Sequence, residues 1–285
     1  MIGNRIRTRL SGRRPRAAGT AALATVALAG LTIGVASSAQ GNESAAAKPT
    51  VVLVHGAWAD ASNWRGVISR LQHDGYNVAA IPNPLRSLTG DAAYVKSYLQ
   101  TVKGPIVLVG HSYGGAVITN AATGVPNVKA LVYVNAFAPD KGETATALAG
   151  PDSALSVKDP TTIFDFVPAK LPPTATTDLY LKKSAVFTSF ATGLSDNEKA
   201  IVAASQRPAA FGGLNEASGV PAWRTIPSWY VIGDGDRIIP PTAQRAMAKR
   251  AGSTITEYHA GHLGLISDPP TVTQQILRAA TATVH

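Results

Sequence analysis

The sequence predicts an α/β fold, with a doubly wound, mostly parallel sheet of about six strands, helices on both faces and an inserted helical cap. Three observations predict it. Short apolar runs rich in β-branched residues recur without alternation, as in strands covered on both faces. Segments with helical spacing separate these runs, and strands that alternate with helices favour parallel pairing. One long Pro-rich segment interrupts the alternation and is too long for a structureless loop, which predicts the cap.

The expected elements follow one another along the chain. The six expected strands are 50–54, 78–81, 106–109, 130–134, 228–232 and 254–258. The expected helices run after Asn63 through Leu71 to Asp74, over 91–102 with Asp91 or Gly90 as the cap, from the turn at 110–114, over 242–251 with Gly252 as the stop, and over 270–283. Together they define one α/β domain over residues 50–285.

The cap is expected at about 137–225, with helical pieces near 177–190 and 195–204. All six Phe of the chain fall inside this segment, at positions 137, 164, 166, 187, 190 and 211. They are expected to form a small core of the cap itself, with some of them facing the sheet. Because the insertion begins directly after a strand end, where ligands bind in such folds, we expect the cap to form the apolar wall of a pocket.

The N-terminus has the parts of a secretory signal peptide, which we expect over residues 1–39. An apolar stretch over 17–36 and a Ser-Ser-Ala site follow a basic region. The basic region contains Arg5, Arg7, Arg9, Arg13, Arg14 and Arg16. A retained membrane anchor is the alternative, since the stretch is about long enough to span, but its Ala, Gly and Thr content favours cleavage. Arg13-Arg14 leaves a twin-arginine route open. The sequence thus predicts a secreted, extracellular protein with a flexible leader over 40–49.

Charge and cysteine content bound the possible partners. The chain has 26 Lys and Arg and 17 Asp and Glu, for a net charge of +9. Six of the Arg lie before residue 40 and no acidic residue does, so the remainder carries only +3 and no nucleic-acid partner is indicated. Without Cys there is neither a disulfide nor a lipidation site. The roughly 246 remaining residues suffice for one large core.

Residues 110–114, Gly-His-Ser-Tyr-Gly, are the strongest functional signal. They lie between the buried run 106–109 and small, helix-compatible residues from Ala116 onward. Strand, sharp turn and helix with Gly-x-Ser-x-Gly on the turn is the pattern of a nucleophile elbow, in which strained backbone exposes the Ser hydroxyl. The sequence therefore predicts Ser112 as a nucleophile, against the alternative of an incidental Gly-rich turn.

A serine nucleophile needs a base and an acid that orients the base. His262 lies in a Gly-flanked loop after the last strand and is preferred over its nearest rival, His259. Asp236 stands just before an apolar run that packs its loop down, whereas Asp234 lies between two glycines and suits a turn. The predicted triad is Ser112, Asp236 and His262.

The oxyanion of such a reaction needs preorganised donors. The N–H of Tyr113, directly after the nucleophile, is one expected donor. The second is expected from the loop after the first strand, where Gly56 keeps the backbone clear, with Ala57 preferred and Trp58 as the alternative. Trp58 and Phe137 are also the residues expected to contact the substrate. A simple tight turn at Gly56 is the competing interpretation.

The chain resembles the α/β-hydrolases, within the small serine-esterase group that also includes plant methyl-ester hydrolases and hydroxynitrile lyases. The matching stretches are 53–58, 110–115, 133–139, 233–240 and the loop of His262. The order Ser, acid, His is that of this fold. In the lyases that the chain resembles, a Thr stands in the loop after the first strand and a Lys directly follows the catalytic His. Gly56 and Leu263 occupy those places here, and this departure from the lyase pattern favours hydrolysis.

The expected function is hydrolysis of a small, largely uncharged carboxylic ester by an exported serine esterase, through an acyl-enzyme. No metal-ligand spacing occurs, and Gly233-x-Gly235 lacks the third Gly of a dinucleotide site, where Ile238 stands, so no cofactor is expected. A lactonase, an amidase or a cofactor-free perhydrolase uses the same triad. A non-catalytic binding protein on this scaffold is the alternative of another class. The sequence leaves acyl preference and oligomeric state open.

Overall fold

The computed structural model describes residues 48–283. The predicted signal peptide, residues 40–47 of the predicted leader and the last two residues lie outside the described residues. Lys48 and Pro49, which were assigned to the flexible leader, contact the domain. The ammonium of Lys48 donates to the carbonyl of Asp74 at 2.5 Å and lies over the ring of Tyr76, and Pro49 is buried. The contacts of the domain thus include the two residues before its first strand.

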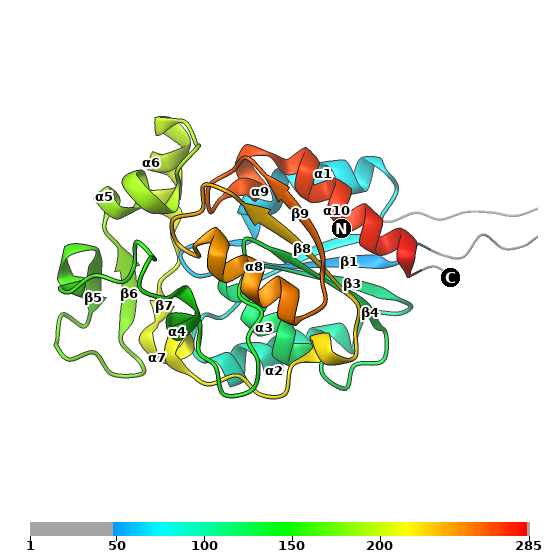
Figure 1. Cartoon of the computed structure of the whole chain (residues 1–285), viewed down its shortest axis with the longest axis horizontal. Coiled ribbons are helices and arrows are strands. Elements are labelled where there is room, and N and C mark those ends of the chain that lie inside the picture. Colours follow the sequence, from blue (N-terminus) through cyan, green and yellow to red (C-terminus); the bar gives the residue numbers. More distant parts are fainter. Residues whose placement is uncertain (1–47, 284–285) are drawn as a thin grey trace, which may run out of the picture. The chain divides into compact units, whose positions relative to one another are not determined.

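A six-stranded sheet with the strand order β2-β1-β3-β4-β8-β9 forms the centre of the domain (Figure 1). Every neighbouring pair in it is parallel. Its strands are β1 (Thr50–Val54), β2 (Val78–Ile81), β3 (Ile106–His111), β4 (Val128–Val134), β8 (Ser228–Gly233) and β9 (Thr254–Tyr258). The predicted strands are confirmed to within two residues at either end. Residues 51–54 and 106–109 are fully buried, as expected of strands covered on both faces.

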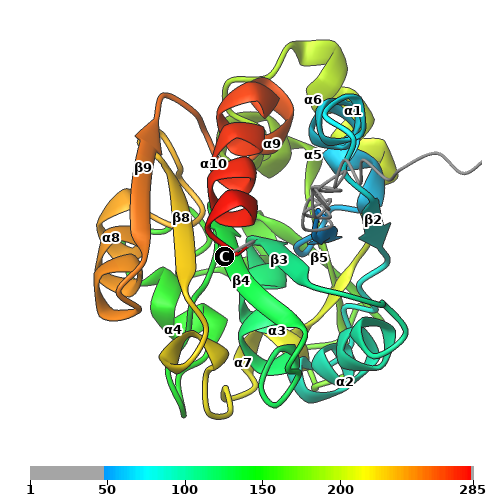
Figure 2. The same ribbon diagram turned by 90° about the vertical axis from the view of Figure 1, so that its right-hand side faces the viewer.

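Helices cover both faces of this sheet, as predicted. Figure 2 shows α1 and α10 on one face and α2 and α3 on the other. The long helices are α1 (Arg65–His73), α2 (Leu88–Leu99), α3 (Tyr113–Ala121), α8 (Pro241–Arg250) and α10 (Pro269–Ala282). The order of the strands explains the layers, because the chain steps one way across the sheet after β1 and the other way after β2, β3 and β8, and crossovers are right-handed. Two short helices precede the helices α1 and α10: η1 (Ala61–Trp64) comes before α1, and α9 (Gly264–Ser267) comes before α10.

The start of α2 corrects the prediction. The helix begins at Leu88, three residues before the predicted start, and neither Asp91 nor Gly90 caps it. Ser87 is the N-cap, and its hydroxyl accepts a hydrogen bond from the N–H of Gly90 at 3.1 Å. Asp91 is instead a fully buried residue of the helix.

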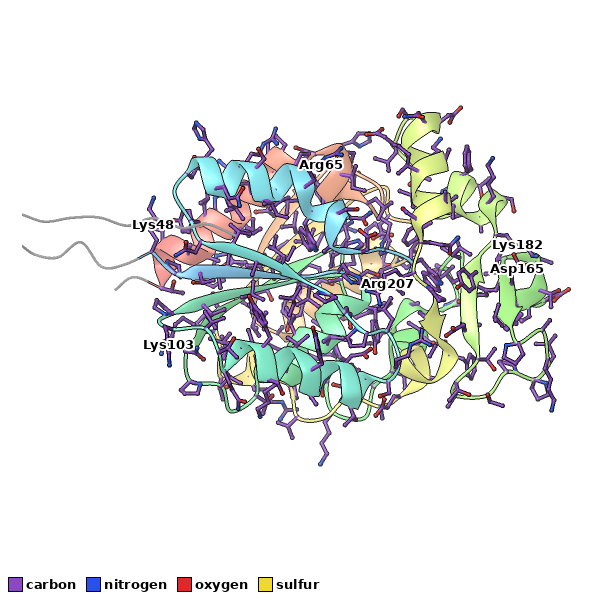
Figure 3. All side chains as sticks on the ribbon, turned by 180° about the vertical axis from the view of Figure 1, so that it is seen from behind. Lys48, Arg65, Lys103, Asp165, Lys182 and Arg207 are labelled. Carbon is purple, nitrogen blue, oxygen red and sulfur yellow. The ribbon has the colours of Figure 1, made fainter. Side chains whose placement is uncertain are left out.

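The cap between β4 and β8 is not purely helical, which corrects the second prediction. It contains a three-stranded antiparallel sheet with the order β5-β6-β7 (Figure 1). Its strands are β5 (Phe164–Val167), β6 (Asp178–Leu181) and β7 (Ala209–Ala210). The predicted helix at 177–190 is wrong over β6, where burial alternates with the period of two that defines a half-buried strand. An ion pair between Lys182 and Asp165 joins the ends of β5 and β6 (Figure 3).

Short helices complete the cap. They are α4 (Ala145–Ala149), η2 (Pro160–Thr162), α5 (Lys183–Ala185), the π-helix η3 (Val186–Phe190), α6 (Asp196–Ser205), α7 (Phe211–Asn215) and η4 (Ala222–Arg224). The prediction for 195–204 is confirmed by α6, which begins with a capping box of Ser195 and Glu198. No helix within residues 48–283 is long and apolar enough to cross a membrane.

Candidate active site

Ser112 lies on strained backbone between β3 and α3, as predicted. Its φ of 54° and ψ of −127° fall outside the ordinary regions for a residue with a side chain. The turn is accommodated by its small neighbours. A Cβ on Gly110 would lie 2.6 Å from the carbonyl oxygen of Gly114, and one on Gly114 would lie 2.5 Å from that of Val54. The two glycines therefore permit the tight strand-to-helix turn that presents the hydroxyl.

The structure brings the three predicted triad side chains together at the carboxyl ends of β3, β8 and β9. Nε2 of His262 lies 2.9 Å from Oγ of Ser112, and its Nδ1 lies 2.9 Å from Oδ2 of Asp236. The Nδ1–H tautomer fits both contacts, with Nε2 free to accept the hydroxyl proton. His262 is fully buried, while Asp236 and Ser112 are 4% and 3% exposed. This chain of hydrogen bonds can remove a proton from Ser112.

Asp236 is held by more donors than the sequence indicated. Its Oδ1 accepts hydrogen bonds from the N–H groups of Ile238 at 2.8 Å and Ile239 at 3.0 Å. Gln244 of α8 and Asn135 at the end of β4 donate to Oδ2 at 2.8 Å and 3.2 Å. Sequence reasoning missed both amides, although Asn135 stands in one of the family-like stretches. The signal that was available is a polar residue at a strand end.

The rival base and acid contact each other, and not the site. Nδ1 of His259 lies 3.1 Å from Oδ2 of Asp234, and the side chain of His259 is 99% exposed. The preference for His262 and Asp236 therefore agrees with the geometry.

The loop after β1 lies against the elbow. A Cβ on Gly56 would come within 2.6 Å of the Cβ of Ser112, so only Gly fits at this approach. Ala57 and Tyr113 both line the cavity above Ser112. Among the residues that the structure describes, neither amide donates a hydrogen bond to the protein. Tyr113 is the first residue of α3, where amides lack a partner within the helix. Both amides are thus free to bind an oxyanion.

Two buried histidines stabilise these loops. Nδ1 of His55 donates to the carbonyl of Gly56 at 2.9 Å, and its Nε2 accepts from the N–H of Asn83 at 2.9 Å. Burial, the largest cause, and the nearby positive charge of Arg207, which lies between sheet and cap in Figure 3, together lower the pKa of His55 to about 4. His55 is therefore neutral and clamps the loop that carries Ala57.

His111 holds the loop of the base. Its Nε2 donates to the carbonyl of His262 at 3.0 Å, and burial holds its pKa well below the usual range. Within the described residues its Nδ1 has no partner. His111 thus supports the carbonyl of His262 and, among the described hydrogen bonds, makes none to the Ser112 hydroxyl.

Trp58 connects the site to the cap. Its indole N–H donates to the carbonyl of Leu179 on β6 at 2.8 Å, and its ring stacks on Phe164 with centroids 5.5 Å apart. Phe190, on the π-helix, meets Trp58 edge-on at 6.0 Å and His262 at 5.3 Å. Trp58 has a left-handed φ of 55°. The cap thus packs directly on the first-strand loop and on the imidazole.

A cavity of about 210 Å³ lies over Ser112. Both predicted substrate contacts, Trp58 and Phe137, line it. Its other large apolar walls are Leu155, Phe164, Leu179, Phe211, Leu214 and Ile238. Most of these side chains belong to the cap, which agrees with the predicted apolar wall. No lining residue is charged, and the donors of Thr146 and Asn215 are bonded to backbone carbonyls. The cavity suits an uncharged, apolar group.

Tyr113 has a buried acidic partner that sequence reasoning missed. Its hydroxyl donates to Oδ2 of Asp91 at 2.9 Å, and Oδ1 of Asp91 accepts from the N–H of Arg86 at 3.1 Å. Burial raises the pKa of Asp91. The pair fixes the Tyr113 ring in the cavity wall. Among residues 48–283, no group of three His, Asp or Glu side chains is placed to hold a metal ion.

This fold and site define the class of the protein. A model described as the alpha/beta hydrolase family matches residues 51–275, and the chain belongs to that family. The carbendazim hydrolyzing esterase of Nocardioides sp. (strain SG-4G) is 34% identical over 110 residues, 34% of this chain and 46% of that protein. The match therefore spans about half the length of this curated relative.

Two further similarities extend over most of the domain. The alpha/beta hydrolase nvfD of Aspergillus novofumigatus is 25% identical over 265 residues, covering 82% of this chain and 97% of that protein. The crystal structure of the methylesterase MES16 from Arabidopsis superposes with a TM-score of 0.68 at 17% identity, covering 82% of this chain and 99% of that one. The resemblance to the fold of plant methyl-ester hydrolases is thereby confirmed.

Proposed function

We propose that the protein is a serine esterase that hydrolyses small, uncharged carboxylic esters. The observation that carries the proposal is the hydrogen-bonded series Ser112, His262 and Asp236, with both contacts at 2.9 Å, beneath an uncharged apolar cavity. Membership of the alpha/beta hydrolase family and the similarity to a carbendazim hydrolyzing esterase support it.

The reaction follows from this arrangement. His262 takes the proton of Ser112 through Nε2 while Oγ attacks the ester carbonyl, and Asp236 stabilises the imidazolium through Nδ1. The amides of Ala57 and Tyr113 bind the oxyanion of the tetrahedral intermediate. His262 then returns the proton to the leaving alcohol, and an acyl group remains on Ser112. Water, deprotonated by the same imidazole, releases the acid.

Steady-state hydrolysis of p-nitrophenyl acetate by the wild type and by Ser112→Ala tests this proposal. We expect the substitution to remove at least about 10³-fold of kcat. Undiminished turnover in Ser112→Ala would contradict it. A parallel panel of lactones, anilides and esters with added peroxide separates ester hydrolysis from the other reactions that such a triad supports.

We further propose that the protein is exported and that residues 1–39 are removed. The basic region, apolar stretch and Ser-Ser-Ala site support this proposal. Expression of the full chain in a secreting bacterial host, followed by N-terminal sequencing of the protein in the medium, tests it. A start near residue 40 is expected, and an intact N-terminus retained in the cell would contradict it.

A further inference from the structure

Asn135 lies directly after β4, between the loop of the acid and the loop of the base. Its Nδ2 is 3.2 Å from Oδ2 of Asp236 and 3.3 Å from the carbonyl oxygen of Gly261, the residue before His262. The side chain is fully buried. One amide group therefore bonds to both loops that have to be aligned for proton transfer.

The orientation of this amide is fixed. The neighbours of Nδ2 are a carboxylate oxygen and the carbonyl oxygen of Gly261, which accept hydrogen bonds, so the NH2 group faces the two loops. Oδ1 is left to accept from the hydroxyl of Tyr258 at 2.6 Å. The backbone N–H of Asn135 donates to the carbonyl of Val231 at 3.0 Å and so anchors the residue to β8. Every polar atom through which Asn135 acts is thus held by a defined partner.

The local backbone is adapted to this position. Asn135 has a left-handed φ of 46°, a conformation that Asn tolerates better than most residues with a side chain. The neighbouring space is open only because residue 233 is Gly, since a Cβ there would lie 2.4 Å from Nδ2 of Asn135. Strain of this kind persists where the surrounding structure holds it, and it occurs often at functional sites.

The three other donors to Asp236 described above come only from the acid's own loop and the helix that follows it. Ile238 and Ile239 belong to the acid's own loop, and Gln244 belongs to the helix that follows it. They fix the carboxylate relative to β8 and α8. Asn135 bonds in addition to the backbone that carries the base, which none of these three does among the described hydrogen bonds.

We propose that Asn135 is a positioning residue that holds the Asp236 carboxylate and the loop of His262 in one mutual orientation. The inference rests on the function proposed above. Asn135 does not line the cavity, so its loss lowers the rate of the chemical steps and leaves the binding of the substrate unchanged. A purely structural residue would instead lower stability without this separation of kcat from KM.

The test is a comparison of kcat, KM and thermal unfolding for p-nitrophenyl acetate hydrolysis. Asn135→Gly removes the amide and accepts the left-handed backbone. Asn135→Asp keeps the shape but faces Asp236 with a second carboxylate. The matched control is Asn127→Ala, because Asn127 precedes the other end of β4 and its Nδ2 also donates to two backbone carbonyls, at 3.0 Å and 3.4 Å. Ser112→Ala reports on the proposed function itself.

We expect kcat of Asn135→Gly to fall by about tenfold with KM within about twofold, since a hydrogen bond to a charged group is lost. We expect the kcat of Asn135→Asp to fall further and the kcat of Asn127→Ala to equal that of the wild type. A folded Asn135→Gly with kcat within about twofold of wild type would overturn the inference. So would an equal loss in Asn127→Ala.

If Asn135→Gly does not fold, Tyr258→Phe tests the role of Asn135 instead. It removes the hydroxyl that orients the amide, and we expect a smaller loss of kcat at unchanged KM, whereas an unchanged kcat would overturn the inference. An active Ser112→Ala would remove the proposed function and the inference together. An inactive Ser112→Ala beside a fully active Asn135→Gly would remove only the role of Asn135.

Discussion

The indole N–H of Trp58 donates a hydrogen bond of 2.8 Å to the carbonyl of Leu179, which joins the loop after β1 to strand β6 of the cap. Ala57, the preferred oxyanion donor, immediately precedes Trp58 in the chain. The position of the cap and the geometry of this loop are therefore linked through one side chain.

Trp58→Phe removes this hydrogen bond while keeping an aromatic ring against Phe164. We expect the free energy of unfolding to fall by about 1 kcal/mol, and kcat to fall several-fold because the loop of Ala57 loses its anchor. Trp223→Phe is the matched control, since the indole of Trp223 also donates to a carbonyl, that of Pro139 at 3.0 Å, away from the cavity. Urea unfolding and initial rates measure both effects, and an equal loss of kcat in the two variants would refute the link.

Gly56→Ala introduces a methyl group at the closest approach of the β1 loop to the elbow. Its Cβ would lie 2.6 Å from the Cβ and 3.1 Å from the Oγ of Ser112, so one of the two loops has to move. We expect kcat/KM to fall by at least about 10²-fold, the usual cost of a displaced oxyanion donor. Gly235→Ala, where the nearest atom is 3.4 Å away, should retain most activity. Comparable kinetics in the two variants would show that this approach does not matter.

The folded protein should lose stability as the pH falls from about 6.5 towards 4. The pKa of His55 is about 4 in the folded state against 6.5 in the unfolded chain, so the unfolded state binds its proton first. The stabilising contribution is fully present above pH 6.5, and its loss amounts to about 3 kcal/mol once the pH has fallen to 4. The lowered pKa of His111 acts in the same direction.

His55→Gln should remove about one proton from the pH dependence of the unfolding free energy in this range. His73→Gln, at an exposed side chain, is the control for the replacement of a histidine as such. Urea unfolding at a series of pH values measures the slopes. An identical slope in His55→Gln and wild type would contradict a buried neutral His55.

The cavity should select against charge and against length. With no charged residue in its lining, it should favour p-nitrophenyl hexanoate over the adipate half-ester, whose distal carboxylate has no partner, by at least about tenfold in kcat/KM. Leu214→Ala should raise the hexanoate-to-acetate ratio of kcat/KM by roughly tenfold, because removing side-chain atoms from the wall enlarges the cavity. Competition between paired substrates measures both ratios, and a preference for the charged ester would contradict the assigned lining.

The inner strands β1, β3, β4 and β8 could be predicted because they are largely buried and are marked by apolar runs. The loops of Gly56, Ser112 and Asp236 could be placed because they follow such strands, whereas the loop of His262 follows the largely exposed edge strand β9. The cap was harder, since β6 is a four-residue strand of a small sheet and its alternation is too short to outweigh a helical interpretation. The start of α2 was missed because Ser87 and Asp91 both suit a helix N-terminus, and only tertiary contacts distinguish them.

Sequence reasoning assigned the site residues whose type is itself reactive, such as Ser112 and His262. Asn135, Gln244 and Asp91 act through contacts with residues far away in the chain. Their residue types are common in loops and helices, and their partners become evident only when β4, α8 and α2 are placed around the elbow. A single sequence carries no local signal for such long-range partners.

The most direct test is to locate the adduct of a fluorophosphonate by peptide mass spectrometry. The reagent needs an activated hydroxyl and then remains bound to it. We predict one adduct, on the peptide containing Ser112 and at its hydroxyl, formed rapidly by the wild type and at least about 10³-fold more slowly by His262→Ala. An adduct at another residue, or equal labelling of His262→Ala, would contradict the assignment of Ser112 as the nucleophile and His262 as its base.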